Sequence, residues 1–378
     1  MDTMDSKLKF EYADMEKDES TGIKIKVIGV GGCGCNIIND MAEFRLKDAE
    51  LIAVNTDMQS IQRVNADDKV QIGNKLTKGG GAGSNPEKGE KAAEEDRDLL
   101  ESKLRGTDML FITCGLGGGT GSGAAPVIAD IARGLDILTV GVVITPTKME
   151  LDNSRKRKIV DESMNRLKDR VNSIITISNE KIFEVCDTAM TVPQAYKEAN
   201  KVLIEIVNGI VTMIARPGLQ NIDFEDVKAT LKQKGDTFLG IGRASGTDKA
   251  KKALDRALKN PFIGDVDISG AKEMLVNFVG NITVAELKEI ENIKKLTGKS
   301  ASLKYGVVCD DSTGDEIEVV ILISGIKNQA AGASLQEVII PDKVEKAATL
   351  LTVGVRGIVD NGYENVDIPT FQRNTGYN

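Results

Sequence analysis

Residues 115–123 read Gly-Leu-Gly-Gly-Gly-Thr-Gly-Ser-Gly, so six of these nine consecutive residues are glycine. The segment follows an apolar run at 109–112 and precedes a helical pattern that begins at Ala124. Backbone without Cβ atoms can fold tightly around an anion, and the first turn of a helix adds unpaired N–H groups. The pattern therefore predicts a strand, a phosphate-binding glycine loop and a helix, in that order.

A second glycine loop, at 29–34, follows a predicted strand and opens a predicted helix. Its sequence, Gly-Val-Gly-Gly-Cys-Gly, satisfies the Gly-x-Gly-x-x-Gly fingerprint of dinucleotide-binding proteins, which leaves an NAD-linked oxidoreductase as one interpretation. A Walker A loop is disfavoured. The Gly-Lys-Ser at 298–300 has Ile293 where that motif requires its first glycine.

Composition excludes several classes of protein. The chain has no histidine, which removes Ser-His-Asp and Cys-His catalysis and imidazole metal sites. A formal net charge of −8 argues against nucleic acid as a partner. No run of apolar residues approaches the ~18 needed for a membrane span, and the N-terminal residues lack the basic and apolar pattern of a signal peptide. The sequence therefore predicts a cytoplasmic protein with no direct membrane insertion. An odd number of cysteines, five, suits a reducing compartment.

Alternating strand and helix patterns predict an α/β fold with a parallel sheet. The predicted strands are 25–30, 51–55, 109–115 and 139–144; the predicted helices are 36–44, 87–105 and one ending near Gly134, with a loop from 56 through 86. A long helix is predicted over 192–215, and its wide apolar stripe indicates packing on more than one side. Beyond it, strands are expected at 237–241, 274–279, 306–309 and 316–324.

The segment 117–123 resembles the tubulin signature motif, and residues 23–326 as a whole resemble the FtsZ family, the tubulin-like GTPases of bacterial cell division. The motifs at 54–57 and 79–86 contribute to the resemblance. It implies a tubulin-like Rossmann-type GTPase domain, a long central helix and a second α+β domain. It also implies hydrolysis of GTP to GDP and phosphate, with Mg²⁺ bound mainly through the phosphates.

The resemblance assigns nucleotide contacts to three loops and to several later positions. The matching loop residues are Gly31, Gly32, Cys33, Gly34, Cys35, Asn36, Ala82, Gly83, Gly117, Gly118, Gly119, Thr120 and Gly121. Tyr196 and Asn200 match positions that stack on and hydrogen-bond to guanine, although Tyr196 could equally be a core aromatic. Glu150 and Arg155 fall near the family's ribose-contacting Glu and following Arg, and Arg157 competes with Arg155 for that role.

Residues 221–227, here called the 221–227 loop, resemble the family's catalytic loop, which enters the nucleotide pocket of the next subunit. In this interpretation Asn221, Asp223 and Asp226 orient and polarise the attacking water. Locally the segment is also an ordinary helix N-cap with an acidic first turn. Catalysis by a neighbour's loop requires head-to-tail assembly, and a contact of that kind builds filaments such as the cytokinetic ring.

Near the C-terminus, Asp367–Arg373 resembles the family's peptide for membrane tethers and division regulators, which implies action at mid-cell on the inner face of the membrane. The predicted organisation is a flexible acidic tail (1–22), a GTP-binding domain (23–191), a central helix (192–216), a C-terminal domain (217–326), a linker (327–365) and a partner-binding peptide (366–378). A tubulin-like nucleotide-binding filament module with another task is a further alternative.

Overall fold

The structure, a computed structural model, describes residues 22–326 except 45, 47, 188, 217, 234–235, 260–267, 269 and 290–300. All described residues belong to one compact unit. The predicted acidic tail (through residue 21), the linker and the C-terminal peptide lie outside the described residues.

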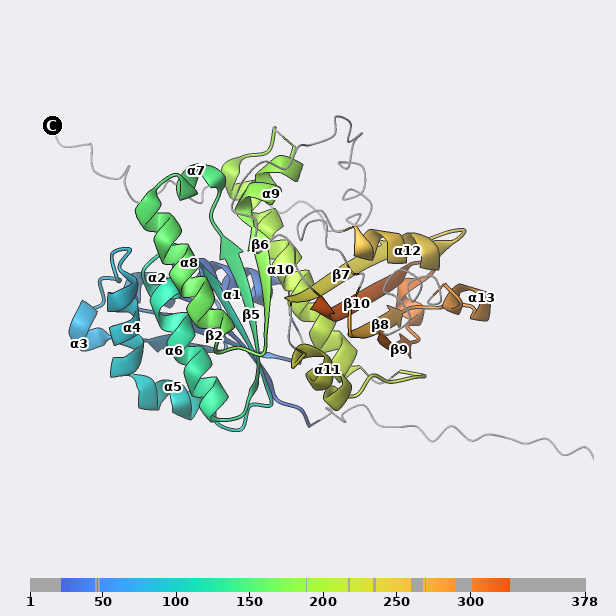
Figure 1. Cartoon of the computed structure of the whole chain (residues 1–378), viewed down its shortest axis with the longest axis horizontal. Coiled ribbons are helices and arrows are strands. Elements are labelled where there is room, and N and C mark those ends of the chain that lie inside the picture. Colours follow the sequence, from blue (N-terminus) through green and yellow to red (C-terminus); the bar gives the residue numbers. More distant parts are fainter. Residues whose placement is uncertain are drawn as a thin grey trace, which may run out of the picture. The chain divides into compact units, whose positions relative to one another are not determined.

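The first sheet has six parallel strands in the order β3-β2-β1-β4-β5-β6 (Figure 1). The strands are β1 (Ile25–Val30), β2 (Glu50–Asn55), β3 (Asp68–Gln71), β4 (Met109–Gly115), β5 (Leu138–Thr145) and β6 (Ser173–Ser178). The strand order reverses between β1 and β4. In Rossmann-type sheets, ligands bind outside the carboxyl ends of the strands at such a reversal.

Helices cover both faces of this sheet (Figure 1), because its strands are apolar on both sides. In β1, for example, Val27 packs into the core on one face and Ile28 into the core on the other. The Val27 face is covered by α1 (Gly31–Glu43), α2 (Met58–Gln62), α9 (Asn179–Val185) and α10 (Val192–Ala215). The Ile28 face is covered by α4 (Pro86–Glu95), α5 (Arg97–Leu104), α6 (Thr120–Gly134) and α8 (Ser154–Lys168). Two short helices, α3 (Asn74–Thr77) and α7 (Lys148–Leu151), lie in connections.

The second sheet is mixed, with the order β7-β10-β8-β9. Its strands are β7 (Asp236–Ala244), β8 (Glu273–Val279), β9 (Ser302–Val308) and β10 (Ile317–Ile326). Strand β10 runs antiparallel to β7 and β8, whereas β9 runs parallel to β8. Helix α12 (Lys249–Leu258) packs on one face, and α10 and α11 (Phe224–Leu231) pack on the other; α13 (Val284–Leu287) and the 3₁₀ turn η1 (Asp311–Thr313) lie in connections.

Helix α10 packs against both sheets and shares one apolar core with them (Figure 1), which confirms the prediction from its wide apolar stripe. Gly209 lies in the middle of this helix. A Cβ at that position would lie 3.0 Å from Ile241 and 3.2 Å from Val320, so the glycine allows the helix to approach the second sheet closely. Among the described residues, no helix is long and apolar enough to cross a lipid bilayer.

Three sequence predictions of local structure are wrong. Helix α1 begins at Gly31 rather than at residue 36, because the second glycine loop forms its first turn. The predicted loop at 56–86 contains α2, β3 and α3. The predicted helix at 87–105 is two helices that meet at Asp96, where the backbone leaves helical geometry and Oδ2 accepts a hydrogen bond of 2.6 Å from the Gly73 N–H.

Candidate functional site

A cleft of about 540 Å³ opens at the carboxyl ends of β1 and β4, where the strand order reverses. Of the residues predicted to contact nucleotide, it is lined by Gly32, Cys33, Asn36, Ala82, Gly83, Gly117, Gly118, Gly119, Thr120, Gly121, Glu150, Tyr196 and Asn200. Residues Gly31, Gly34, Cys35 and Arg155 do not line it. The fold thus brings segments from all three predicted loops to one place.

The two predicted phosphate loops pack directly on each other behind the cleft. Gly31 has a φ of 73°, and a Cβ on it would lie 2.8 Å from the Gly121 nitrogen. A Cβ on Gly34 would lie 2.6 Å from the Thr113 carbonyl oxygen. These glycines are therefore required for close approach of the backbones rather than for contact with a ligand.

The 79–86 loop closes another side of the cleft. A Cβ on Gly119 would lie 2.9 Å from the Ala82 Cβ, so this loop touches the start of α6. The Thr56 and Thr120 hydroxyls share a buried hydrogen bond of 2.7 Å, which ties the end of β2 to the same point. Asn85 caps α4 by accepting a hydrogen bond of 3.0 Å from the Glu87 N–H, as the sequence predicts.

Two helix N-termini face the cleft without side-chain caps. The N-cap positions of α1 and α6 are Val30 and Gly119, and neither makes a side-chain capping bond, whereas α4 and α8 are capped by asparagines. A Cβ on Gly32 or Gly118 would meet no atom within 4 Å, so backbone is open there. Exposed N–H groups and two positive dipole ends are the donor set that phosphate prefers.

Glu150 and Lys156 form an ion pair at the edge of the cleft. Burial favours the neutral Glu150 carboxyl, but hydrogen bonds from Lys156 and Thr147 outweigh it and hold the pKa of Glu150 below its ordinary value. A Cβ added to Gly117 would lie 3.0 Å from the Lys156 Cε, so the Lys156 side chain lies over the glycine loop. Arg155 and Arg157 are exposed and do not line the cleft. Asn153 caps α8 by accepting hydrogen bonds from the Arg155 and Lys156 N–H groups, but nothing in the sequence shows which of the neighbouring cations faces the cleft.

Tyr196 and Asn200 lie on the first turns of α10 and line the same cleft. Tyr196 is 42% exposed, so it is not a core residue, and its ring forms an edge-to-face pair with Phe183, with centroids 5.7 Å apart. The Asn200 Nδ2 donates a hydrogen bond of 2.7 Å to the Asp40 carboxylate. Burial raises the pKa of Asp40, and the bond from Asn200 partly opposes this shift.

Asn179 is a cleft residue that the sequence analysis missed. It directly follows β6, and its Oδ1 atom is buried without a hydrogen-bond partner among the described residues. A buried amide oxygen without a partner is costly, which fits a donor on a bound ligand. The available signal was the alternating apolar run of 173–178 followed by Asn, since side chains at the carboxyl ends of parallel strands face such a crevice.

The thiols near the cleft are neutral. Burial raises the pKa of Cys33 to about 11 and that of Cys35 to about 12. A Cβ added to Gly115 would lie 2.9 Å from the Cys33 Sγ, so the Cys33 side chain packs against the start of the glycine loop at 115–123. In the described part of the chain, no group of three acidic or cysteine side chains could hold a metal ion.

The 221–227 loop lies elsewhere, on the second sheet. Asn221 Oδ1 accepts a hydrogen bond of 2.5 Å from the Gly218 N–H, and Asp223 is the N-cap of α11, accepting 2.7 Å from the Asp226 N–H. Asp226 forms an ion pair with Lys304 of β9. None of these three predicted catalytic residues lines the cleft of the same chain.

Comparison with known proteins gives matches over most of the chain. Residues 24–187 match the model for the GTPase domain of the Tubulin/FtsZ family, and residues 235–327 match that for the FtsZ family C-terminal domain. The cell division protein FtsZ of Coxiella burnetii is 38% identical over 354 residues, covering 93% of this chain and 88% of the relative. FtsZ 1 of Thermococcus kodakarensis is 40% identical over 323 residues, covering 84% of this chain and 85% of the relative.

Solved structures agree. A structure described as an empty FtsZ dimer of M. jannaschii has a TM-score of 0.73 and 38% identity, covering 82% of this chain and 89% of its own. CetZ1 of Haloferax volcanii shares the fold, with a TM-score of 0.68 and 22% identity. The match covers 81% of this chain and 95% of the CetZ1 chain. None of these matches supports the NAD-linked oxidoreductase that the second glycine loop left open. The chain belongs to the Tubulin/FtsZ family of GTPases and, within it, to the FtsZ cell-division proteins.

Proposed function

We propose that the cleft binds GTP and that hydrolysis occurs only after the 221–227 loop of the next subunit closes over it. The observation that carries this proposal is that the cleft and the three predicted catalytic residues of one chain lie apart. The cleft has the backbone donors for a triphosphate, but Asn221, Asp223 and Asp226 do not line it. A site divided in this way is completed by a head-to-tail contact, which also builds a filament.

In the proposed complex, the backbone N–H groups of the signature loop and the first turns of α1 and α6 hold the phosphates. Tyr196 stacks on the base, while Asn200 and the unpartnered Asn179 oxygen hydrogen-bond to its edge. The Glu150 carboxylate accepts hydrogen bonds from the ribose hydroxyls, and Lys156 contacts the phosphates over Gly117. Phosphoryl transfer needs positioning and charge stabilisation more than covalent chemistry, so these contacts suffice on this side.

From the neighbour, the Asp223 and Asp226 carboxylates accept hydrogen bonds from the attacking water and orient it toward the terminal phosphate. Asn221 anchors the loop through its bond to Gly218. Mg²⁺, when bound with the nucleotide, neutralises charge on the phosphates. We expect Mg²⁺ to be held mainly through the phosphates of the bound nucleotide.

The direct test is GTP turnover per subunit at increasing protein concentration. We expect almost no turnover in dilute protein and a steep rise above a threshold that coincides with the appearance of filaments by light scattering, because isolated subunits lack a complete site. Constant turnover per subunit from dilute to concentrated protein would contradict the proposal.

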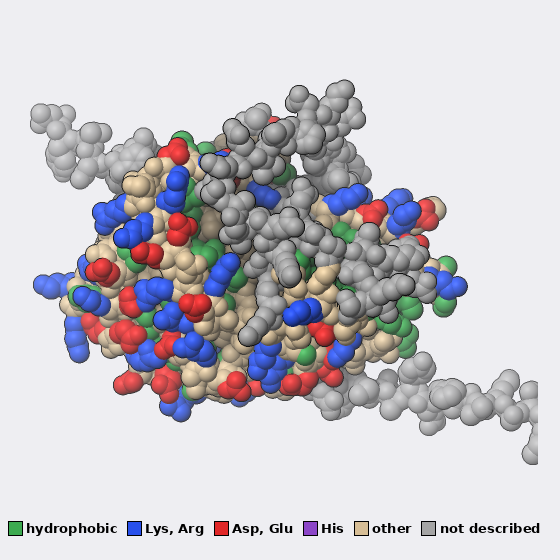
Figure 2. Space-filling model, in the orientation of Figure 1, with side chains coloured by type: hydrophobic (Ala, Val, Ile, Leu, Met, Phe, Trp, Pro, Cys, Tyr) green, Lys and Arg blue, Asp and Glu red, His purple; other side chains and the backbone are tan. Residues whose placement is uncertain are grey.

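We also propose that the filaments assemble in the cytoplasm as the cytokinetic ring at mid-cell, and that Asp367–Arg373 is a peptide ligand for membrane tethers and regulators. The support is the sequence: Ile368 and Phe371 flank Pro369, which limits the entropy lost when such a peptide docks in a groove. On the face shown in Figure 2, acidic and basic side chains of the described residues are interspersed.

Deletion of residues 367–378 is expected to leave GTP turnover and filament formation unchanged while abolishing recruitment of filaments to membranes that carry a tether. Co-sedimentation with tether-bearing vesicles measures this recruitment, and vesicles without the tether are the control. Unchanged recruitment, or loss of polymerisation, would mean that the tail has another role.

A further inference from the structure

Lys304 of β9 reaches across to the 221–227 loop and pairs with Asp226 at the start of α11. Its side chain is 47% exposed, whereas that of Asp226 is 21% exposed. The ammonium donates a hydrogen bond to one oxygen of that carboxylate, Oδ1. The second oxygen, Oδ2, makes no hydrogen bond within the described part of the chain.

Strand β9 also holds the backbone of the loop. Gln220 and Val307 exchange two backbone hydrogen bonds of 2.8 and 3.3 Å. Between these contacts and Lys304 lies Gly306, where a Cβ would lie 3.1 Å from Ile222 and 3.2 Å from the Gln220 carbonyl oxygen. The same strand therefore fixes the start of the loop through its backbone and the end of the loop through the Lys304 side chain.

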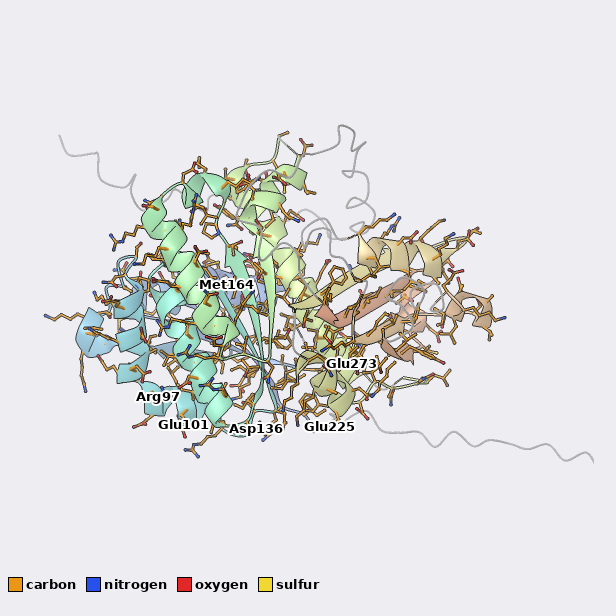
Figure 3. The ribbon with its side chains drawn as sticks, in the orientation of Figure 1. Arg97, Glu101, Asp136, Met164, Glu225 and Glu273 are labelled. Atoms are coloured by element: carbon orange, nitrogen blue, oxygen red, sulfur yellow. The ribbon has the colours of Figure 1, made fainter. Side chains whose placement is uncertain are left out.

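The surroundings of this ammonium are acidic. Its hydrogen bond to Asp226 comes first among the causes that raise the pKa of Lys304, followed by the charges of Asp226, Asp223 and Glu273. Figure 3 labels Glu225 on α11 and Glu273 on the adjacent β8. Because Asp223 and Asp226 share one helical turn, their carboxylates repel each other, and the cation between β9 and α11 offsets that repulsion.

We propose that Lys304 is a positioning residue for GTP hydrolysis, which acts by holding the Asp226 carboxylate with Oδ2 directed to the neighbour's cleft. The inference rests on the proposed function of the 221–227 loop. In an assembled filament this carboxylate has to approach a triphosphate, which repels it. An ammonium bound to Oδ1 keeps the side chain in one rotamer and reduces the repulsion, so the water-orienting geometry is preorganised.

The test compares four variants at protein concentrations well above the assembly threshold. Lys304→Met keeps the length of the side chain and removes its charge, and Lys304→Arg restores the charge. Lys228→Met is the matched control, because Lys228 pairs with Glu225 on the same helix at 3.2 Å but does not contact Asp226. The fourth variant combines Lys304→Met with Asp226→Ala, and it is compared with Asp226→Ala alone.

We expect Lys304→Met to lower turnover on the order of 10-fold, with the GTP concentration for half-maximal rate and the assembly threshold unchanged, since only positioning is lost. Lys304→Arg and Lys228→Met should stay within about threefold of the parent. In the Asp226→Ala background, Lys304→Met should cause no further loss, because residues that act through one group are not additive.

Unchanged turnover in Lys304→Met, or an equal additional loss in the Asp226→Ala background, would overturn the inference while leaving the divided site intact. A shifted assembly threshold at unchanged maximal turnover would also overturn it, since Lys304 would then act on filament contacts. If Asp226→Ala alone keeps its turnover, the proposed function itself fails, and this inference fails with it.

Discussion

Asp226→Ala is expected to lower GTP turnover by a factor on the order of 100 or more, the usual cost of removing a group that stabilises a phosphoryl-transfer transition state. GTP binding should be unchanged, because Asp226 does not line the cleft of its own chain. Filaments should then persist longer, since the nucleotide that holds them is hydrolysed slowly. Turnover by phosphate release and binding by nucleotide titration measure the two effects separately.

Glu225→Ala is the matched control, because Glu225 lies on the same turn of α11 and pairs only with Lys228 among the described residues (Figure 3). It should retain near-normal turnover. Asp223→Ala should resemble Asp226→Ala but is less clean, since Asp223 caps α11 and its loss costs about 1 kcal/mol of stability. Near-normal turnover in both aspartate variants would show that this segment is only a helix cap.

Gly31→Val is expected to lower GTP affinity by roughly 10- to 100-fold. The residue has a φ of 73°, and its Cβ would lie 2.8 Å from the Gly121 nitrogen, so the two phosphate loops must separate. A strained residue of this kind costs about 1–3 kcal/mol, and each 1.4 kcal/mol changes an affinity tenfold. Nucleotide titration of the folded variant measures the loss.

Gly106→Val controls for backbone strain. Gly106 has a φ of 75°, but an added Cβ meets no atom within 4 Å, and the residue does not line the cleft. Gly106→Val should lower the melting temperature through backbone strain alone and leave GTP affinity unchanged. Equal losses of affinity in both variants would mean that Gly31 matters for stability and not for the geometry of the phosphate loops.

Periodicity predicted the central elements of the fold closely. The strands at 25–30 and 109–115 and the helix at 192–215 have the predicted bounds, because each is a long, buried and strongly patterned run. Strand β3 was missed since it is a short edge strand in which Val70 is buried and its neighbours are polar. The break at Asp96 depends on a hydrogen bond from Gly73, a tertiary contact that the helical sequence 87–105 does not reveal.

The site was predictable where chemistry is local. The two phosphate loops meet in one cleft because they follow the neighbouring parallel strands β1 and β4, and Tyr196 and Asn200 line the same cleft from α10. Which cationic side chain of 153–158 lines the cleft was not predictable, because the answer depends on the rotation of α8. Lys156 lines the cleft, and Arg155 and Arg157 do not. The pairing of Lys304 with Asp226 joins residues 78 positions apart and depends on the packing of β9 against α11.

The most direct test of the divided site is to mix Asp226→Ala with Gly31→Val at a GTP concentration near the parent's half-saturation, where each variant alone is expected to have low turnover. Asp226→Ala retains an intact cleft and Gly31→Val retains an intact 221–227 loop, so a contact joins two intact halves when the loop of a Gly31→Val subunit meets the cleft of an Asp226→Ala subunit. An equimolar mixture should recover up to roughly a quarter of parental turnover, because about half of the clefts and half of the loops are intact. Turnover equal to the sum of the separate variants would contradict the claim that hydrolysis requires residues from two subunits.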